Sequence, residues 1–482
     1  MPQFSINSPS PYRRITALLP LMLMLAATDV AAQTLAQETA EASSPANVIL
    51  IIGDGMDDQQ ITIARNYLEG AAGRLALDTL PHRGAVQVLT IENQVDGAPV
   101  YVADSANTAT SLATGKVTSR GRIATSAGDD RDLTTLLELA AAKGLATGIV
   151  TTSSITDATP ASFMAHISAR VCESPVAMQN VTIRNIPVGD CSPDLKANGG
   201  PGSISEQIAA SPVTVVLGGG LKHFTPKAEG SDQTVIEQAQ QAGFNVISKS
   251  SELASVASAE RSLGLFASSH LPVRLRGAEG REAQAPDPSL LNHVHKYLGD
   301  VTMPAPMVCE PEPDYGNTPS LQAMTDAALA RLSRDTDQGF FLMIESASID
   351  KKSHERRPCG SIGEVEQLDE ALQSSLAFAQ RHPRTLVIVT ADHAQAAQLI
   401  PSKSLFAAYP VPIFSPGMIA RITTPEGGLM TINYATNNFA YEEHTGATVP
   451  LAGNQLARDL VPGYTTQPEL HSIMLQHLQL AD

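Results

Sequence analysis

The chain has 482 residues, of which 43% are hydrophobic and 17% charged, and its 34 Gly and 32 Pro are ordinary usage for a globular protein. This composition excludes a collagen-like or low-complexity chain, and it excludes disorder over most of the length. The formal charge of −17 excludes a generally basic nucleic-acid-binding protein, so any site for anions must be built locally from positive groups.

The first 32 residues have the pattern of a secretory signal peptide. Two adjacent arginines precede an apolar run over residues 15–27, and small residues follow it. The run is too short to span a bilayer, and no later stretch offers about 20 uninterrupted apolar residues. We therefore predict cleavage near Ala32, a periplasmic or secreted location, no membrane span, and a disordered leader over residues 33–46. A buried N-terminal helix is the alternative interpretation.

From Asn47 onward, short apolar runs alternate with helical patterns. The runs are nearly continuous, as strands of a sheet covered on both faces require, and lie at 48–52, 147–151, 213–217, 341–344 and 385–390. Helices are predicted at 133–143, 234–242, 320–333 and 364–381. The alternation predicts an α/β fold with a large doubly wound, mostly parallel sheet and helices on both faces, as one domain over residues 47–482. Ligands bind such sheets at the carboxyl ends of the strands.

The first predicted strand ends at a carboxylate between two glycines, in the order Gly53-Asp54-Gly55. Glycines on either side allow a ligand to approach without side-chain crowding. The alternative is an ordinary Asp-Gly turn. Asp54 is therefore a candidate only in combination with other residues.

Ser105 stands where a helical pattern begins, directly after Asp104. Its structural interpretation is a helix N-cap. Its functional interpretation is a nucleophile at a helix N-terminus, where free N–H groups and the helix dipole favour a phosphate. A serine hydroxyl needs a base or a metal to activate it, and no GxSxG motif surrounds Ser105. The sequence therefore does not favour a Ser-His-Asp hydrolase.

Two later strands are followed by metal-ligand residues. Asp350 and His354 are four residues apart, so on a helix they share one face and can bind one ion, although a surface ion pair is the alternative. Asp392 and His393 follow the strand at 385–390, and His444 lies in a loop near the carboxyl end. Carboxylate with imidazole suits Zn²⁺.

The four cysteines contain no CxxC pair, so a zinc-thiolate site or a redox motif is not expected. All four lie in the part of the chain predicted to be exported, where disulfides form. Sequence order favours Cys172–Cys191 and Cys309–Cys359, although four cysteines allow three connectivities.

Taken together and in this order, these segments resemble the alkaline phosphatase family, closest to its bacterial periplasmic members. The similarity covers nearly all of the mature chain, from Asn47 to its last helix near the C-terminus. Its most specific parts are the stretch 345–354, the segment TLVIVTADH at 385–393, and Asp157-Ala158-Thr159-Pro160 followed by Arg170.

The resemblance implies two Zn²⁺ and one Mg²⁺ per chain. The implied ligands are Asp350, His354 and His444 for one zinc, Asp54, Asp392 and His393 for the other, and Asp54, Thr159 and Glu345 for magnesium. It further implies Ser105 as the nucleophile and Arg170 as the phosphate clamp, oriented by Asp104. Asp157 and Lys351 would act through water.

The implied activity is hydrolysis of small phosphate monoesters through a phosphoserine, by a homodimer. One alternative is a phosphodiesterase or sulfatase of the same superfamily. Those relatives use a Thr, or a modified Cys or Ser in a CxPxR-like context, and they lack the magnesium ligands. A non-catalytic metal- or phosphate-binding protein is the other alternative, and retention of Ser105 beside both zinc sets disfavours it.

Overall fold

A computed structural model describes residues 45–183, 186–334, 338–404, 406 and 416–480. The predicted signal peptide lies outside these residues, as does all of the predicted leader except Pro45 and Ala46. Ala46 is buried, so the end assigned to a disordered leader is part of the folded domain. Among the described residues, no helix is both long enough and apolar enough to cross a membrane.

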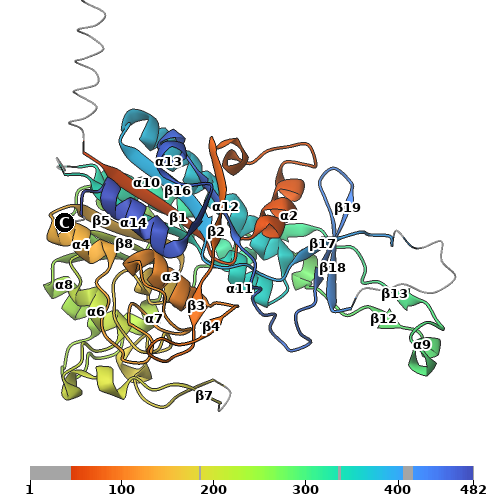
Figure 1. Cartoon of the computed structure of the whole chain (residues 1–482), viewed down its shortest axis with the longest axis horizontal. Coiled ribbons are helices and arrows are strands. Elements are labelled where there is room, and N and C mark those ends of the chain that lie inside the picture. Colours follow the sequence, from red (N-terminus) through yellow and green to blue (C-terminus); the bar gives the residue numbers. More distant parts are fainter. Residues whose placement is uncertain (1–44, 184–185, 335–337, 405, 407–415, 481–482) are drawn as a thin grey trace, which may run out of the picture. The chain divides into compact units, whose positions relative to one another are not determined.

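A ten-stranded sheet forms the centre of the domain (Figure 1). In spatial order its strands are β21 (Tyr464–Thr466), β2 (His82–Gln87), β20 (Val449–Gly453), β16 (Thr385–Ala391), β1 (Asn47–Gly53), β15 (Phe340–Ser346), β5 (Ala146–Ser154), β8 (Val215–Gly219), β10 (Arg261–Leu265) and β9 (Phe244–Ile247). The seven strands from β16 to β9 are parallel neighbours, whereas β20 is antiparallel to both β16 and β2. The prediction of a mostly parallel sheet is confirmed.

The strands at the middle of the sheet are buried along their whole length. Every residue of β1, β15 and β16 is buried, which matches their continuous apolar runs. Two pairs of helices, each packed together, cover the two faces: α10 (Leu321–Leu332) with α12 (Pro358–Arg381), and α3 (Ser105–Thr114) with α14 (Gln467–His477) (Figure 1). The two faces are therefore both shielded from solvent, as a doubly wound fold requires.

The remaining elements are short and lie around this centre. The other helices are α2 (Asp58–Leu68), α4 (Leu136–Ala142), α5 (Ala158–Ala161), α6 (Ile204–Ala210), α7 (Leu221–Phe224), α8 (Val235–Gln241), α9 (Leu290–Val294), α11 (Ser348–His354) and α13 (Gln455–Leu460). A three-stranded sheet contains β17 (Gln398–Ile400), β19 (Leu429–Tyr434) and β18 (Met418–Thr423). Strand pairs are β3 (Thr90–Ile91) with β4 (Pro99–Val100), β6 (Val181–Ile183) with β7 (Ile186–Gly189), β11 (Leu275–Gly277) with β14 (Cys309–Pro311), and β12 (Asp287–Pro288) with β13 (Val301–Thr302).

Two predicted helices begin at other residues than expected. The first, α4, starts at Leu136, three residues late, because the side chain of Thr135 caps it by accepting a hydrogen bond from the N–H of Glu138. The other, α12, starts at Pro358, six residues early, because proline is well suited to the first helical position.

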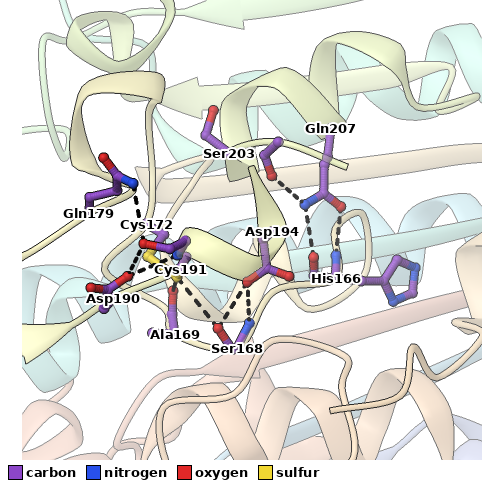
Figure 2. Close-up of a disulfide and its surroundings, with 12 residues drawn as sticks. His166, Ser168, Ala169, Cys172, Gln179, Asp190, Cys191, Asp194, Ser203 and Gln207 are labelled. Carbon is purple, nitrogen blue, oxygen red and sulfur yellow. Dashed lines mark hydrogen bonds between the residues drawn. A yellow bond between two sulfur atoms is a disulfide. The ribbon is translucent and has the colours of Figure 1, made fainter. Parts of the chain in front are cut away.

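Both disulfides favoured by sequence order are present, Cys172–Cys191 and Cys309–Cys359, so all four cysteines are bonded. Figure 2 shows the first one together with hydrogen bonds that hold the adjacent segment. Asp194 Oδ2 accepts from the hydroxyl of Ser168 at 2.9 Å, and Gln207 Oε1 accepts from the N–H of His166 at 2.8 Å. This segment leads directly to Arg170, one of the predicted site residues.

Candidate active site and metal centre

The parallel register of three neighbouring strands brings predicted ligands to one edge of the sheet. Glu345, near the end of β15, is the register partner of Ile52 in β1, and Gly53 pairs with Ala391 in β16. Asp54 and Asp392 directly follow these two strands. Residues separated by hundreds of positions therefore meet at the carboxyl ends, where ligands bind in α/β sheets.

The first group of ligand residues is Asp54, Asp392 and His393, and all three side chains are buried. His393 Nε2 lies 3.4 Å from Asp54 Oδ1 and 3.4 Å from Asp392 Oδ2. Burial, followed by the neighbouring carboxylates Asp392 and Asp350, raises the pKa of Asp54 well above its usual value. Carboxylates crowded together in this way require a compensating positive charge to ionise together.

Gly55 is essential to the packing of this group. Its φ of +66° is in the left-handed region, and a Cβ there would lie 2.8 Å from Gln395 Cγ and 3.0 Å from Asp350 Cβ. Its N–H donates to Asp392 Oδ1 at 3.0 Å. The glycine after Asp54 thus allows the backbone to lie close to Gln395 and Asp350. An ordinary Asp-Gly turn at the surface would not require this close approach.

The second group is Asp350, His354 and His444. Asp350 and His354 lie on α11, and the two Asp350 oxygens are 3.4 Å from His354 Nε2 and 3.3 Å from His444 Nε2. Each imidazole donates its Nδ1–H to a backbone carbonyl, that of Glu442 for His354 and that of Ala103 for His444. Both Nε2 atoms therefore present a lone pair, and they lie 2.9 Å apart. Two lone pairs facing each other beside a carboxylate fit a shared cation.

His393 lies between the two groups. It is within ligand distance of Asp350 and His444 as well as of Asp54 and Asp392, and its ring stacks on that of His444 with centroids 3.6 Å apart. In addition, the buried Oδ2 of Asp392 has no hydrogen-bond partner among the described residues. Two sets of ligand atoms that share His393, one with Asp350 and His444 and one with Asp54 and Asp392, are thus close enough together to hold a metal ion each.

The predicted magnesium ligands Glu345 and Thr159 are both buried. Glu345 Oε2 accepts hydrogen bonds from the hydroxyls of Thr151 and Ser153, and burial raises its pKa to about 7. Thr159 lies on α5, which packs against β15, and its hydroxyl has no hydrogen-bond partner among the described residues. A donor set made only of oxygens suits Mg²⁺.

Ser105 is the first residue of α3, and its hydroxyl contacts the first ligand group. Ser105 Oγ lies 3.2 Å from His393 Nε2 and 3.4 Å from Asp54 Oδ1. The N-cap is Asp104, whose carboxylate accepts from the N–H of Asn107, so Ser105 does not serve as the cap. The structural interpretation of Ser105 is therefore wrong, and its hydroxyl is left facing the metal ligands.

Arg170 and Lys351 share the carboxylate of Asp157. Arg170 Nη2 lies 3.0 Å from Asp157 Oδ1, and Lys351 Nζ lies 2.6 Å from Asp157 Oδ2. Arg170 Nη1 also lies 3.3 Å from Asp104 Oδ2, and Lys351 Nζ lies 3.9 Å from Asp54 Oδ2. Although burial opposes ionisation, Lys351 and Arg170 hold the pKa of Asp157 well below its usual range. The two cations are thereby fixed beside the ligand groups.

Two residues that touch this site, Gln395 and His270, were not predicted from the sequence. Gln395 donates from Nε2 to Asp350 Oδ1, and its position two residues after His393 was the available signal. His270 Nδ1 accepts from the N–H of Ser154 at 3.1 Å and lies 3.9 Å from Asp157 Oδ2. No spacing in the sequence connects His270 to the other residues, because it reaches the site from beyond β10.

The chain matches the alkaline phosphatase family model over residues 45–415. Streptomycin-6-phosphate phosphatase of Streptomyces griseus is 39% identical over 98% of this chain and 98% of its own length. Alkaline phosphatase of Escherichia coli is 38% identical over 93% of this chain and 89% of its own length.

A solved structure, the alkaline phosphatase of the Antarctic bacterium TAB5, shares the fold with a TM-score of 0.62 at 22% identity, covering 91% of this chain and 99% of that one. With buried Asp and His groups at the carboxyl edge of this fold and relatives of this similarity, the chain belongs to the alkaline phosphatase family and is a phosphomonoesterase.

Proposed function

We propose that this phosphomonoesterase works by covalent catalysis at Ser105, with two Zn²⁺ and one Mg²⁺ per chain. The observation that carries the proposal is the position of the Ser105 hydroxyl, at the start of the buried helix α3 and within 3.4 Å of His393 and Asp54. A serine there has both a metal-ligand group to activate it and helix N–H groups that favour a phosphate.

The proposed ligands are those of the two carboxylate–imidazole groups for zinc, and Asp54, Thr159 and Glu345 for magnesium. Zinc held by these residues would supply Lewis-acid stabilisation to the Ser105 oxygen and to the leaving-group oxygen. Three divalent ions would bring six positive charges to four ligating carboxylates, so the site has a surplus that matches a phosphate dianion. This surplus accounts for anion binding by a protein of net negative charge.

Two residues of the chain act directly on the phosphate: Arg170 binds it, and Ser105 forms a covalent bond to it. Arg170, held by Asp104 and Asp157, offers a planar donor set to two phosphate oxygens. The Ser105 Oγ–P bond forms as the bond from phosphorus to the leaving-group oxygen breaks. Water then cleaves the phosphoserine, which returns the Ser105 hydroxyl and releases inorganic phosphate.

Trapping the phosphoserine tests this mechanism. The metal-replete protein is incubated with labelled substrate at mildly acidic pH, quenched and digested, and label is expected on the peptide that contains Ser105. Ser105→Ala should abolish labelling. The control is Ser111→Ala, on the same helix, whose hydroxyl donates to the carbonyl of Asn107, away from the ligand groups. Label on another peptide, or none in the wild type, would refute the role of Ser105.

We propose that the enzyme discriminates little between phosphate monoesters that differ in their leaving group. The relative named for streptomycin 6-phosphate covers almost all of the chain, so a phosphorylated aminoglycoside belongs in the test beside simple esters. A phosphate monoester, a diester, a sulfate ester and streptomycin 6-phosphate should be compared side by side. We expect hydrolysis of both monoesters at similar kcat/KM. A faster diester or sulfate ester would favour the alternative superfamily activities.

We further propose that the enzyme is a periplasmic or secreted homodimer, cleaved near Ala32. The two disulfides support an oxidising compartment, and family resemblance supports the dimer. N-terminal sequencing of the exported protein and light scattering after size-exclusion chromatography test these two points. A retained residue 1, or a monomer at micromolar concentration, would contradict them.

A further inference from the structure

Arg356 lies two residues after the end of α11, and its buried guanidinium bonds to a loop that includes Asn437, Phe439 and Glu442. Its Nε lies 2.7 Å from Glu442 Oε2, and its Nη1 donates to the carbonyl of Phe439 at 2.8 Å. Its Nη2 reaches both the carbonyl and the side-chain oxygen of Asn437, at 3.3 and 3.1 Å. One side chain thus ties three positions of the loop to the helix.

Glu442 connects this ion pair to His354 through two hydrogen bonds, and it lies two residues before His444. Its backbone N–H donates to the carbonyl of His354 at 2.9 Å, and its carbonyl accepts from His354 Nδ1. Its Oε1 accepts from the N–H of Thr436 at 2.9 Å. His444 follows only two residues later, so the placement of Glu442 limits where both imidazoles can lie.

Packing alone does not hold this loop. Of residues 435–443, all of which the structure describes, Glu442 alone is buried, and Phe439 is 65% exposed. Arg356 itself has a φ of 55°, a conformation that non-glycine residues rarely adopt and that persists only where the surroundings impose it. The chain reverses there, immediately after His354, and this reversal directs the guanidinium towards the loop.

We propose that Arg356 and Glu442 are positioning residues that hold His354 and His444 in the geometry of a single metal site. The inference rests on the proposed zinc role of these two histidines. Imidazole ligands bind metal well only when partners beyond them fix the ring orientation. The ion pair supplies this restraint to two ligands that lie 90 positions apart in the chain, on a segment that is otherwise at the surface.

Arg356→Ala, Glu442→Ala and the double variant Arg356→Ala/Glu442→Ala test the proposal, with Arg357→Ala as the matched control. Arg357 is the next residue, but its side chain is 47% exposed and pairs with Glu282 and Glu355 instead. The double variant is decisive, because each single variant also leaves one buried charge without its partner.

Zinc release into excess chelator and hydrogen exchange of the metal-free protein are the measurements. We expect the double variant to lose one of the two zinc ions at least tenfold faster than the wild type and to retain the other. Residues 436–444 should exchange faster even without metal, and Glu442→Gln, which keeps the side-chain shape, should lie between wild type and Glu442→Ala. Arg357→Ala should behave as the wild type in both measurements.

Wild-type zinc release and exchange in the double variant would overturn the positioning role. Loss of both ions together would also overturn it, because the effect would then be on the fold as a whole. A wild-type protein that binds no zinc would instead refute the proposed metal assignment, so the two failures are distinguishable. If a single alanine variant does not fold, Glu442→Gln and the double variant carry the same comparison.

Discussion

Lys351 Nζ lies 2.6 Å from Asp157 Oδ2, so the ammonium that follows the ligand Asp350 is paired within the site and is not solvated at the surface. Its side chain is only 17% exposed. Burial alone would lower the pKa of Lys351, but Asp157 and Asp54 raise it, so the charge is retained at alkaline pH. Lys351 and Arg170 therefore place two positive charges beside the ligand groups.

Lys351→Ala should therefore raise KM and weaken inhibition by inorganic phosphate, while kcat holds steady or rises at alkaline pH. A cation beside the phosphate binds substrate and product alike, so its loss weakens both and speeds product release. The effect should be that of one screened charge, roughly fivefold or about 1 kcal/mol. Inhibition constants for phosphate measure it. Lys352→Ala, which removes an ion pair with Glu355, is the control, and unchanged phosphate inhibition in Lys351→Ala would contradict the prediction.

His354→Ala and Glu345→Gln should remove different metals. His354 supplies an imidazole to the second ligand group, so its loss should cost one zinc and most of the activity. Glu345 supplies only oxygen atoms, so Glu345→Gln should mainly cost magnesium. Elemental analysis of the purified variants checks both outcomes. A full complement of zinc in His354→Ala would show that the ligand assignment is wrong.

The two disulfides should differ in their effect on catalysis. Closing loops of 19 and 50 residues stabilises by about 3 and about 4 kcal/mol in the chain-entropy model. Replacing Cys172 and Cys191 by Ser should also raise KM, because Cys172 is two residues from Arg170. Replacing Cys309 and Cys359 should lower the unfolding midpoint with KM unchanged. Urea unfolding and steady-state kinetics on the same preparations compare the two variants. Equal KM values in the two variants would argue against coupling between the Cys172–Cys191 disulfide and Arg170.

His166 and Glu138 form a pair whose contribution to stability depends on pH. His166 Nε2 lies 2.9 Å from Glu138 Oε1. Burial lowers the pKa of His166, but the bonds to Glu138 and to the carbonyl of Ala124 outweigh it and raise the pKa above its usual value. Burial likewise opposes ionisation of Glu138, but His166 and the N–H of Thr135 lower its pKa.

The folded state therefore favours protonated His166 and ionised Glu138. The stabilisation is lost as the pH rises through the raised pKa of His166, and it is also lost as the pH falls through the lowered pKa of Glu138. His166→Gln should lower the free energy of unfolding most near pH 5 to 6 and least near pH 9, by less than about 1 kcal/mol because Glu138 is partly exposed. Thermal unfolding across this range measures it. A loss that grows towards pH 9 would have the wrong sign.

The sequence was sufficient to predict the central strands because their burial on both faces leaves a continuous apolar run. It was not sufficient for β2, β20 and β21, which form the mixed side of the sheet. The strand β2 reads HRGAVQ, with exposed and buried residues interleaved, and its pairing depends on β20, more than 360 residues away. Such a strand is specified by its partners more than by its own composition.

The site residues likewise fall into a set that the sequence predicts and a set that it does not. Asp54, Glu345 and Asp392 follow strong strand signals, so their meeting point follows from the topology. Gln395, His270 and Arg356 reach the site through loops, and their roles depend on where the backbone turns. Arg356 gives no local signal at all, because its left-handed backbone conformation and its partner Glu442 appear only in the folded chain.

The positions of the ligand residues along the chain determine when, during synthesis, each ligand group can be completed. The ligand atoms come from residue 54 at one extreme and residue 444 at the other, so the first group needs Asp54 together with Asp392 and His393, and the second group needs His444. A chain still being synthesised therefore cannot complete the second group until its last tenth, which contains His444, has been made. Binding of a full set of metal ions would therefore require an almost complete chain.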